Sequence, residues 1–195
     1  MTNKIIGIQG DKLDKINISS DTSIFLAHEA QQLGYKIFYY TPSNLSIIKN
    51  KTYANGVFLK FNYERKKFYK IYKKQKIDVE NLKFILIRQD PPFNSEYLIT
   101  TLILDGLKKV KVINNPTAIR NVSEKLYSKH FIKFMPNTLF SNNIVEIKKF
   151  YNQNKSMIMK PINGYGGNQI HLIKNKFSKK LITNFLNKNG HSMFQ

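Results

Sequence analysis

The sequence predicts an α/β protein, with a Rossmann-like domain built on a parallel sheet over residues 1–122 and a smaller α+β unit over residues 123–195. Two observations lead to this prediction. Short apolar runs alternate with amphipathic helical stretches in the first part, which is typical of βαβ units. After an Asn-Pro turn at Asn115-Pro116, the pattern changes to a compact second series ordered β-α-β-β-α-β.

The first part opens with a β-α-β unit. Residues 4–9 (KIIGIQ) form a short apolar strand, residues 21–34 an amphipathic helix and residues 35–40 (YKIFYY) the next strand. Ser20 or Asp21 can cap the helix, and the glycine at its end can stop it. Two strands joined through a helix in this way are expected to be parallel, with a right-handed crossover.

An antiparallel insertion is expected next, because residues 46–76 have no helical period and contain Asn55-Gly56, a favoured hairpin turn. The first part then continues with a strand at 83–88, the loop QDPPFN, a helix at about 95–108 and a strand at 110–114.

The second part begins near Ser123 with a short basic helix. Its other elements are a strand at 137–140, a helix with Ile144, Ile147 and Tyr151 on one face, a strand at 156–161, a glycine loop, a strand at 169–174, a helix capped by Ser178 and the closing stretch HSMFQ.

The composition excludes several classes of protein. The 195 residues suffice for one full core, or for a small domain and part of another. There is no cysteine, so neither a disulfide framework nor a thiolate metal site is possible. No apolar run approaches the roughly 20 residues of a membrane span, and the N-terminus lacks a secretory pattern. We therefore expect a cytoplasmic protein that does not contact membranes. The four histidines show no metal-ligand spacing.

The formal net charge of +20 has two interpretations. A basic nucleic-acid-binding module is one. Compositional bias is the other, because lysine is scattered along the whole chain together with abundant asparagine and isoleucine. The densest basic run, residues 63–76, interleaves aromatic residues with cations, but a strand with one solvated face produces the same pattern. We expect no dedicated nucleic-acid site.

The first candidate binding site is the stretch MIMKPINGYGG, Met157–Gly167. The strand ends in Lys160, and Gly164, Gly166 and Gly167 follow in the loop. Glycines let backbone N–H groups approach an anion, and a lysine adds a point charge to the same phosphates. The pattern is not a Walker A loop. A plain hairpin with a glycine-rich tip explains the motif equally well by itself.

A second candidate site is RQDPPF at the carboxyl end of a predicted strand, where open α/β sheets bind their ligands. Arg88 and Asp90 are suited to a zwitterionic substrate, with the arginine on a carboxylate and the aspartate on an amine. Alternatively, the two residues pair with each other and brace the turn.

A third candidate is Lys125 in NNPTAIRNVSEKLYS. If Ser123 caps the following helix, Lys125 lies in its first turn, where the helix dipole disfavours a cation. A nearby anion would explain the lysine, and Arg120 could bind the same anion. An ordinary solvated lysine is the alternative.

Three stretches in this order resemble bacterial glutathione synthetase, an ATP-grasp enzyme: INISSDTSIFLAHEAQQLGYKIFYYTPSNL, IRQDPPFN with NNPTAIRNVSEKLYS, and MIMKPINGYGG. The second is specific to that family, and the pattern KP..G.GG is shared among ATP-grasp ligases. The resemblance implies a pre-ATP-grasp domain at 1–122 and the first lobe of an ATP-grasp domain, left incomplete, at 123–195. One departure is the loop QGDKLDKIN, which lacks the proline of the family's Met-Asp-Pro-like loop.

The resemblance also implies a reaction, in which ATP phosphorylates γ-glutamylcysteine and glycine attacks the acyl phosphate. It implies that Lys125, Lys160, Gly164, Gly166, Gly167 and Gln195 bind ATP and that Arg88 and Asp90 lie towards the peptide. It places the Mg²⁺ ligands in a second lobe beyond residue 195, so we expect no metal or catalytic residue here and no turnover from this chain alone. A homo-oligomer is implied for the full-length enzyme. Another ATP-grasp carboxylate–amine ligase is the alternative within the superfamily.

Overall fold

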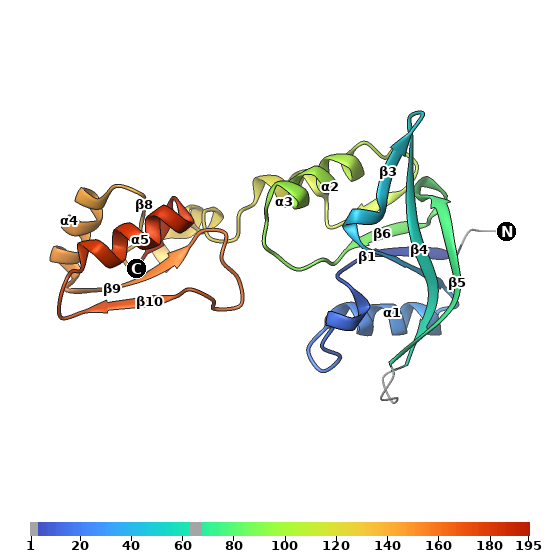
Figure 1. Ribbon diagram of the computed structural model, residues 1–195, viewed down its shortest axis with the longest axis horizontal. Coiled ribbons are helices and arrows are strands. Elements are labelled where there is room, and N and C mark those ends of the chain that lie inside the picture. Colours follow the sequence, from blue (N-terminus) through green and yellow to red (C-terminus); the bar gives the residue numbers. More distant parts are fainter. Residues whose placement is uncertain (1–3, 63–67) are drawn as a thin grey trace. The chain divides into compact units, whose positions relative to one another are not determined.

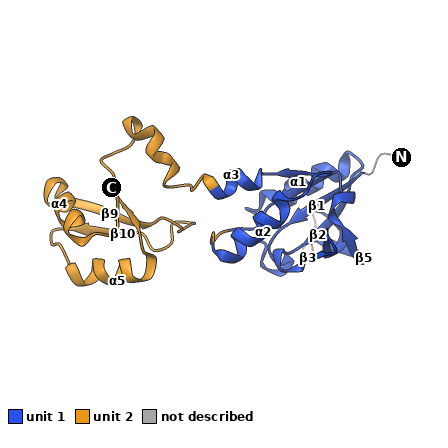
Figure 2. Cartoon of the chain, turned by 90° about the horizontal axis from the view of Figure 1, so that it is seen from above, with its two compact units in different colours: residues 1–90, 94–120 blue, residues 91–93, 121–195 orange. Residues whose placement is uncertain are grey.

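The computed structural model describes residues 4–62 and 68–195 of the chain. It separates into two compact units (Figure 2). Unit 1 comprises residues 1–90 and 94–120, and unit 2 comprises residues 91–93 and 121–195. Among the described residues, no helix is both long and apolar enough to cross a membrane.

Unit 1 is built on one mixed sheet with the strand order β3-β4-β2-β1-β6-β7, and β5 pairs with β4 (Figure 1). The parallel part consists of β1 (Ile5–Gln9), β2 (Lys36–Tyr40), β6 (Phe84–Ile87) and β7 (Lys111–Ile113). The helices are α1 (Thr22–Gln32), α2 (Ser95–Asp105) and α3 (Pro116–Asn121), with short 3-10 turns η1 (Leu13–Lys15), η2 (Pro42–Asn44) and η3 (Val79–Asn81).

Helices cover both faces of this sheet, as expected for a doubly wound fold (Figure 1). On one face Ile24 and Ala27 of α1 pack against apolar side chains of the central strands. On the other face Leu104 of α2 packs against a cluster that includes Phe38 and Phe58. The predicted strand–helix–strand opening is confirmed. Asp21 caps α1, since its carboxylate accepts a hydrogen bond from the Ser23 N–H at 2.6 Å.

The antiparallel insertion is confirmed, but its predicted turn is wrong. Strands β3 (Leu45–Ile48), β4 (Lys51–Phe61) and β5 (Tyr69–Asp78) pair antiparallel, and the first hairpin turns at Lys49-Asn50, where φ is 48° and 60°. Asn55-Gly56 lies inside β4. A Cβ atom on Gly56 would lie 2.5 Å from the ring of Phe38 and 2.6 Å from the backbone oxygen of Tyr39, so this glycine serves packing rather than a turn.

Only part of the basic run at residues 63–76 belongs to the described structure. Its first residues, 63–67, lie outside the described residues, and the remainder forms most of β5 at the edge of the sheet. Its side chains from Lys70 to Lys76 are exposed, and the Lys76 ammonium lies over the ring of Tyr53, 4.9 Å from its centroid. A solvated edge strand rich in lysine is a common device against edge-to-edge pairing.

Unit 2 has the predicted order β-α-β-β-α-β. Its elements are β8 (Leu139–Ser141), α4 (Ile144–Asn154), β9 (Ser156–Pro161), β10 (His171–Lys174), α5 (Lys179–Asn189) and β11 (Ser192–Phe194). The strands form an antiparallel sheet ordered β10-β9-β11-β8. Side chains of α4 and α5, including Ile147 and Phe185, pack on one face of it with Met159 and Phe194.

The beginning of unit 2 differs from the prediction. No helix starts at Ser123: residues 124–126 form a turn, and the 3-10 segment η4 (Tyr127–Phe134) follows. Ser123 does not act as a side-chain cap. Its backbone oxygen accepts a hydrogen bond from the Tyr127 N–H at 2.8 Å. The predicted cap at Ser178 is confirmed, because its hydroxyl accepts from the Leu181 N–H at 3.4 Å.

Candidate functional site

Two of the predicted nucleotide residues meet on the sheet of unit 2. The Lys160 ammonium donates to the side-chain oxygen of Gln195 at 2.6 Å, and the Gln195 amide nitrogen donates to the hydroxyl of Thr138 at 3.1 Å. Gln195 extends β11 beside β9, exchanging both backbone hydrogen bonds with Ile158. Because the lysine is held by a neutral amide and not by a carboxylate, its charge remains available to an anionic ligand.

The glycine loop begins directly after β9 and holds the other predicted lysine. Lys125 donates from its ammonium to the backbone oxygen of Gly164, and only 15% of its side chain is exposed. Gly164 has no room for a side chain, since a Cβ atom there would lie 2.9 Å from Pro161. Gly166 and Gly167 adopt φ of 58° and 73°, which glycine tolerates best.

Unit 2 therefore brings Lys125 against the glycine loop. It also brings Lys160, on the strand β9 that leads into that loop, against Gln195. Two ammonium groups beside a glycine-rich loop can neutralise a polyphosphate, and the glycines let backbone N–H groups approach it. The position expected for Lys125, in the first turn of a helix, is wrong. Its proximity to the loop comes from the turn at residues 124–126 and its contact with Gly164.

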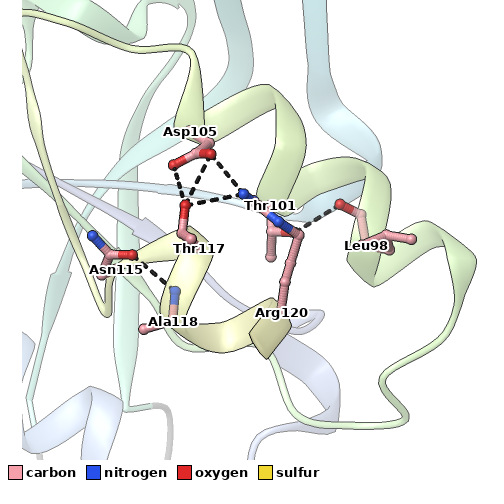
Figure 3. Close-up of polar contacts among 7 residues, drawn as sticks. All are labelled: Leu98, Thr101, Asp105, Asn115, Thr117, Ala118 and Arg120. Atoms are coloured by element: carbon pink, nitrogen blue, oxygen red, sulfur yellow. Dashed lines mark hydrogen bonds and ion pairs between the residues drawn. The ribbon is translucent and has the colours of Figure 1, made fainter. Parts of the chain in front are cut away.

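Arg120, which the sequence offered as a possible second cation for the same anion, has its partners within unit 1. Its guanidinium donates to the Asp105 carboxylate at 2.6 Å and to the Thr117 hydroxyl at 3.0 Å, and Thr117 donates to the same carboxylate (Figure 3). These contacts tie the end of α2 to α3 within unit 1. The Asp105 pKa lies below its ordinary value because of the hydrogen bonds from Arg120 and Thr117. Arg120 is therefore structural.

Unit 1 contains the second candidate site at a topological switch point. β1 lies between β2 and β6, so the connection that leaves the carboxyl end of β1 leads to β2 on one side, and β6 pairs with β1 on the other side. Open α/β sheets bind ligands outside the carboxyl ends of the strands at such a point. A cavity of about 300 Å³ opens there and is lined by residues that include Asp11, Asp21, Arg88 and Asp90.

Arg88 is oriented by the start of α1. Its Nε donates to the Ser23 hydroxyl at 3.0 Å and one terminal nitrogen donates to the Thr22 hydroxyl at 2.6 Å. The Asp90 backbone N–H donates to the Asp11 carboxylate at 2.8 Å. Among the described residues, no ion pair joins Arg88 to Asp90, so the alternative in which they brace the turn by pairing is wrong.

The electrostatics of this cavity favour a bound cationic group. Partial burial raises the pKa of Asp90, and the charges of Asp11 and Asp21 raise it further, while Arg88 acts in the opposite direction. An ammonium group would relieve the repulsion among these carboxylates. The cavity thus presents a guanidinium and carboxylates together, which suits a zwitterion.

Sequence reasoning missed Asp11, Thr22 and Ser23 in this cavity, and Thr138 beside Gln195. Asp11 follows a predicted parallel strand, so its position beyond the carboxyl end of β1 was a usable signal. The hydroxyl groups could not be found in this way, because their roles depend on where the helix start and the neighbouring strand lie.

The family model of the prokaryotic glutathione synthetase N-terminal domain matches residues 5–120. The family model of the prokaryotic glutathione synthetase ATP-grasp domain matches residues 124–195. The chain belongs to the prokaryotic glutathione synthetase family. The resemblance expected from its three motifs is thus confirmed. The glutathione synthetase of Mesorhizobium japonicum is 35% identical over 163 residues, which cover 83% of this chain and 52% of that protein. The chain spans about half the length of the curated glutathione synthetases that it matches.

Solved structures show the same fold at low sequence identity. D-cycloserine synthetase DcsG aligns with a TM-score of 0.65 and 10% identity over 98% of this chain and 58% of that chain. A RimK domain ATP-grasp protein from Sphaerobacter thermophilus aligns with a TM-score of 0.59 and 10% identity, over 98% and 63%. The α/β fold with an ATP-grasp lobe, predicted from the sequence, is confirmed.

Proposed function

We propose that this chain supplies the N-terminal domain and the first ATP-grasp lobe of an ATP-dependent ligase that joins γ-glutamylcysteine and glycine. Residues 1–122 would form the first of these and residues 123–195 the second. The observation that carries the proposal is the convergence in unit 2 of Lys125, Lys160 and the glycine loop. Membership of the glutathione synthetase family supplies the reaction class.

The nucleotide is assigned to unit 2 because of its donors. Lys125 lies against the glycine loop through Gly164, and Lys160 lies at the end of the strand that leads into it. In the proposal both lysines contact phosphate oxygens, while Gly166 and Gly167 let the loop backbone close on them. Gln195, which directly follows β11, is assigned to the adenine side. Bound ATP supplies the phosphoryl group that activates the substrate carboxylate.

The peptide substrate is assigned to the cavity of unit 1. γ-Glutamylcysteine carries an ammonium group and carboxylates. Arg88, fixed by two hydroxyl groups, retains N–H donors for a carboxylate, and Asp90 with Asp11 attracts the ammonium group. Glycine as the second substrate, a homo-oligomeric full-length enzyme and a cytoplasmic location are parts of the same proposal.

Magnesium does not fit the residues of unit 2. From residue 121 onward the sequence has only two acidic residues, Glu124 and Glu146. Glu124 is 80% exposed in its side chain, and Glu146 pairs with Lys149 on α4. Among the described residues, no group of three or more acidic or histidine side chains is arranged to hold a metal. We therefore assign no step to a metal held by this chain.

The proposal is tested by nucleotide binding to the chain itself. Lys125→Met and Lys160→Met should each weaken ATP binding at least about tenfold, since each removes one charge-assisted contact, and a factor of ten corresponds to about 1.4 kcal/mol. Lys174→Met at the exposed end of β10 is the control, because it removes the same charge outside the site. Equal losses in all three variants would show that only the overall positive charge attracts the nucleotide.

A further inference from the structure

We infer that Thr138 is a positioning residue for the nucleotide site: its hydroxyl fixes the direction of the Gln195 amide, and this amide in turn holds the Lys160 ammonium. These hydrogen bonds join only residues of this chain. Their consequence for ATP binding rests on the proposed function. Thr138 lies outside every motif that the sequence singled out.

The strand register places these three side chains on one face. Leu139 of β8 lies opposite Phe194 of β11, so Thr138 and Gln195, the adjoining residues, are cross-strand neighbours. Leu139, Phe194 and Met159 pack into the core under α4 and α5. Because side chains alternate along a strand, Thr138, Gln195 and Lys160 lie on the opposite face of the sheet.

The groups at the two ends of this series of hydrogen bonds determine which atom donates in each of them. At one end, the Thr138 hydroxyl donates to the backbone oxygen of Pro136 at 2.7 Å, and a carbonyl can only accept. At the other end, the Lys160 ammonium can only donate, and it reaches the Gln195 side-chain oxygen at 2.6 Å. The Gln195 NH₂ group must therefore donate to the Thr138 oxygen, as the 3.1 Å contact allows.

A glutamine side chain has nearly the same shape in its two amide orientations, so packing alone does not choose between them. Without the Thr138 hydroxyl, the NH₂ group of Gln195 would lose its acceptor. The opposite orientation would turn this NH₂ group towards the Lys160 ammonium, where two donors meet and neither finds an acceptor. Thr138 thus anchors the NH₂ end of the Gln195 amide, which keeps the oxygen at its other end directed at Lys160.

The first test is made on the free chain by nuclear magnetic resonance. In the wild type, the Gln195 side-chain amide protons should be shifted and slow to exchange compared with those of solvated glutamines. Thr138→Val keeps the shape of the side chain but removes the hydroxyl, and it should abolish this difference and shift the Lys160 side-chain signals. Thr138→Ser keeps the hydroxyl and should resemble the wild type. Unchanged spectra in Thr138→Val would overturn the inference.

The second test connects the residue to nucleotide binding through a double-mutant cycle. Thr138→Val should weaken ATP binding about three- to tenfold, and Thr138→Ser less than twofold. In the Lys160→Met background, Thr138→Val should cause no further loss, because the lysine through which it acts is gone. An equal loss in both backgrounds would show that Thr138 acts independently of Lys160 and would refute the positioning role.

The two tests separate this inference from the proposed function. If the wild-type chain binds no nucleotide, the nucleotide assignment fails, while the spectra of Thr138→Val and Thr138→Ser still decide whether Thr138 orients Gln195. Far-ultraviolet circular dichroism and thermal unfolding of each variant exclude loss of the fold as the cause of a change.

Discussion

Replacing Gly56 by alanine should destabilise unit 1, because the added methyl group has no space. The Cβ atom would lie 2.5 Å from the Phe38 ring and 2.6 Å from the Tyr39 backbone oxygen. Non-bonded carbon atoms normally stay about 3.5–4.0 Å apart, so roughly 1 Å must open. Phe38 is fully buried between Tyr40 and Phe58, at centroid distances of 5.9 Å and 5.2 Å, and cannot turn away.

The expected magnitude follows from two opposing terms. Overpacking a core costs about 1–3 kcal/mol, and the upper part of the range applies here because one of the close atoms belongs to the backbone of β2, paired with β4. Loss of glycine flexibility in the unfolded chain offsets about 0.4–1 kcal/mol. Gly56→Ala should therefore reduce the free energy of unfolding by about 2 kcal/mol.

Urea-induced unfolding followed by circular dichroism measures this loss, and Gly106→Ala is the matched control in the same unit. Gly106 ends α2 with a φ of −73°, and a Cβ atom there would lie 3.6 Å from its nearest neighbour, which is ordinary contact. This variant should be neutral or more stable by up to about 1 kcal/mol. Equal stability of Gly56→Ala and the wild type would refute the close packing of Gly56 against β2.

Three further predictions concern other parts of the chain. Met159→Ala, which empties a fully buried position in unit 2, should cost about 2–5 kcal/mol of unfolding free energy in the same assay. The pKa of Asp90 is raised, so the folded chain holds the proton of this carboxyl more tightly than the unfolded chain does. The free energy of unfolding should therefore fall as the pH rises from 3.8 through the pKa of Asp90 in the folded chain. In a carbon-13 titration, Asp11→Asn should lower the pKa of Asp90, because it removes a neighbouring negative charge. Arg120→Gln should raise the depressed pKa of Asp105 in a similar titration, because the carboxylate loses its main hydrogen-bond donor. The stabilisation from the Arg120–Asp105 pair should disappear as the pH falls below 3.8 through the pKa of Asp105 in the folded chain.

Secondary structure was predictable wherever local patterns and local caps agreed. The apolar run at residues 4–9 became β1, and the caps at Asp21 and Ser178 begin α1 and α5. The error at Asn55-Gly56 has a physical cause. A glycine that relieves a clash with a distant ring looks the same in the sequence as one that allows a turn, and the turn itself formed at Lys49-Asn50 without glycine.

The candidate site was predictable only in part. The lysine and glycines of Met157–Gly167 could be proposed from the sequence because they are close together in it and their chemistry is local. The ion pair of Arg120 with Asp105 could not be predicted, because it joins the end of α2 to α3 across 15 residues, whereas the sequence showed only that Arg120 is close to Lys125.

The sequence by itself determined the fold class, the order of most elements and the family, since hydrophobic periodicity and short motifs are properties of neighbouring residues. Only the tertiary structure decided which distant groups meet: Thr138 with Gln195, Lys125 with the glycine loop, and Arg88 with the start of α1. These contacts depend on strand register and on the paths of loops, which are set by packing between segments 39 to 66 residues apart and not by any local pattern.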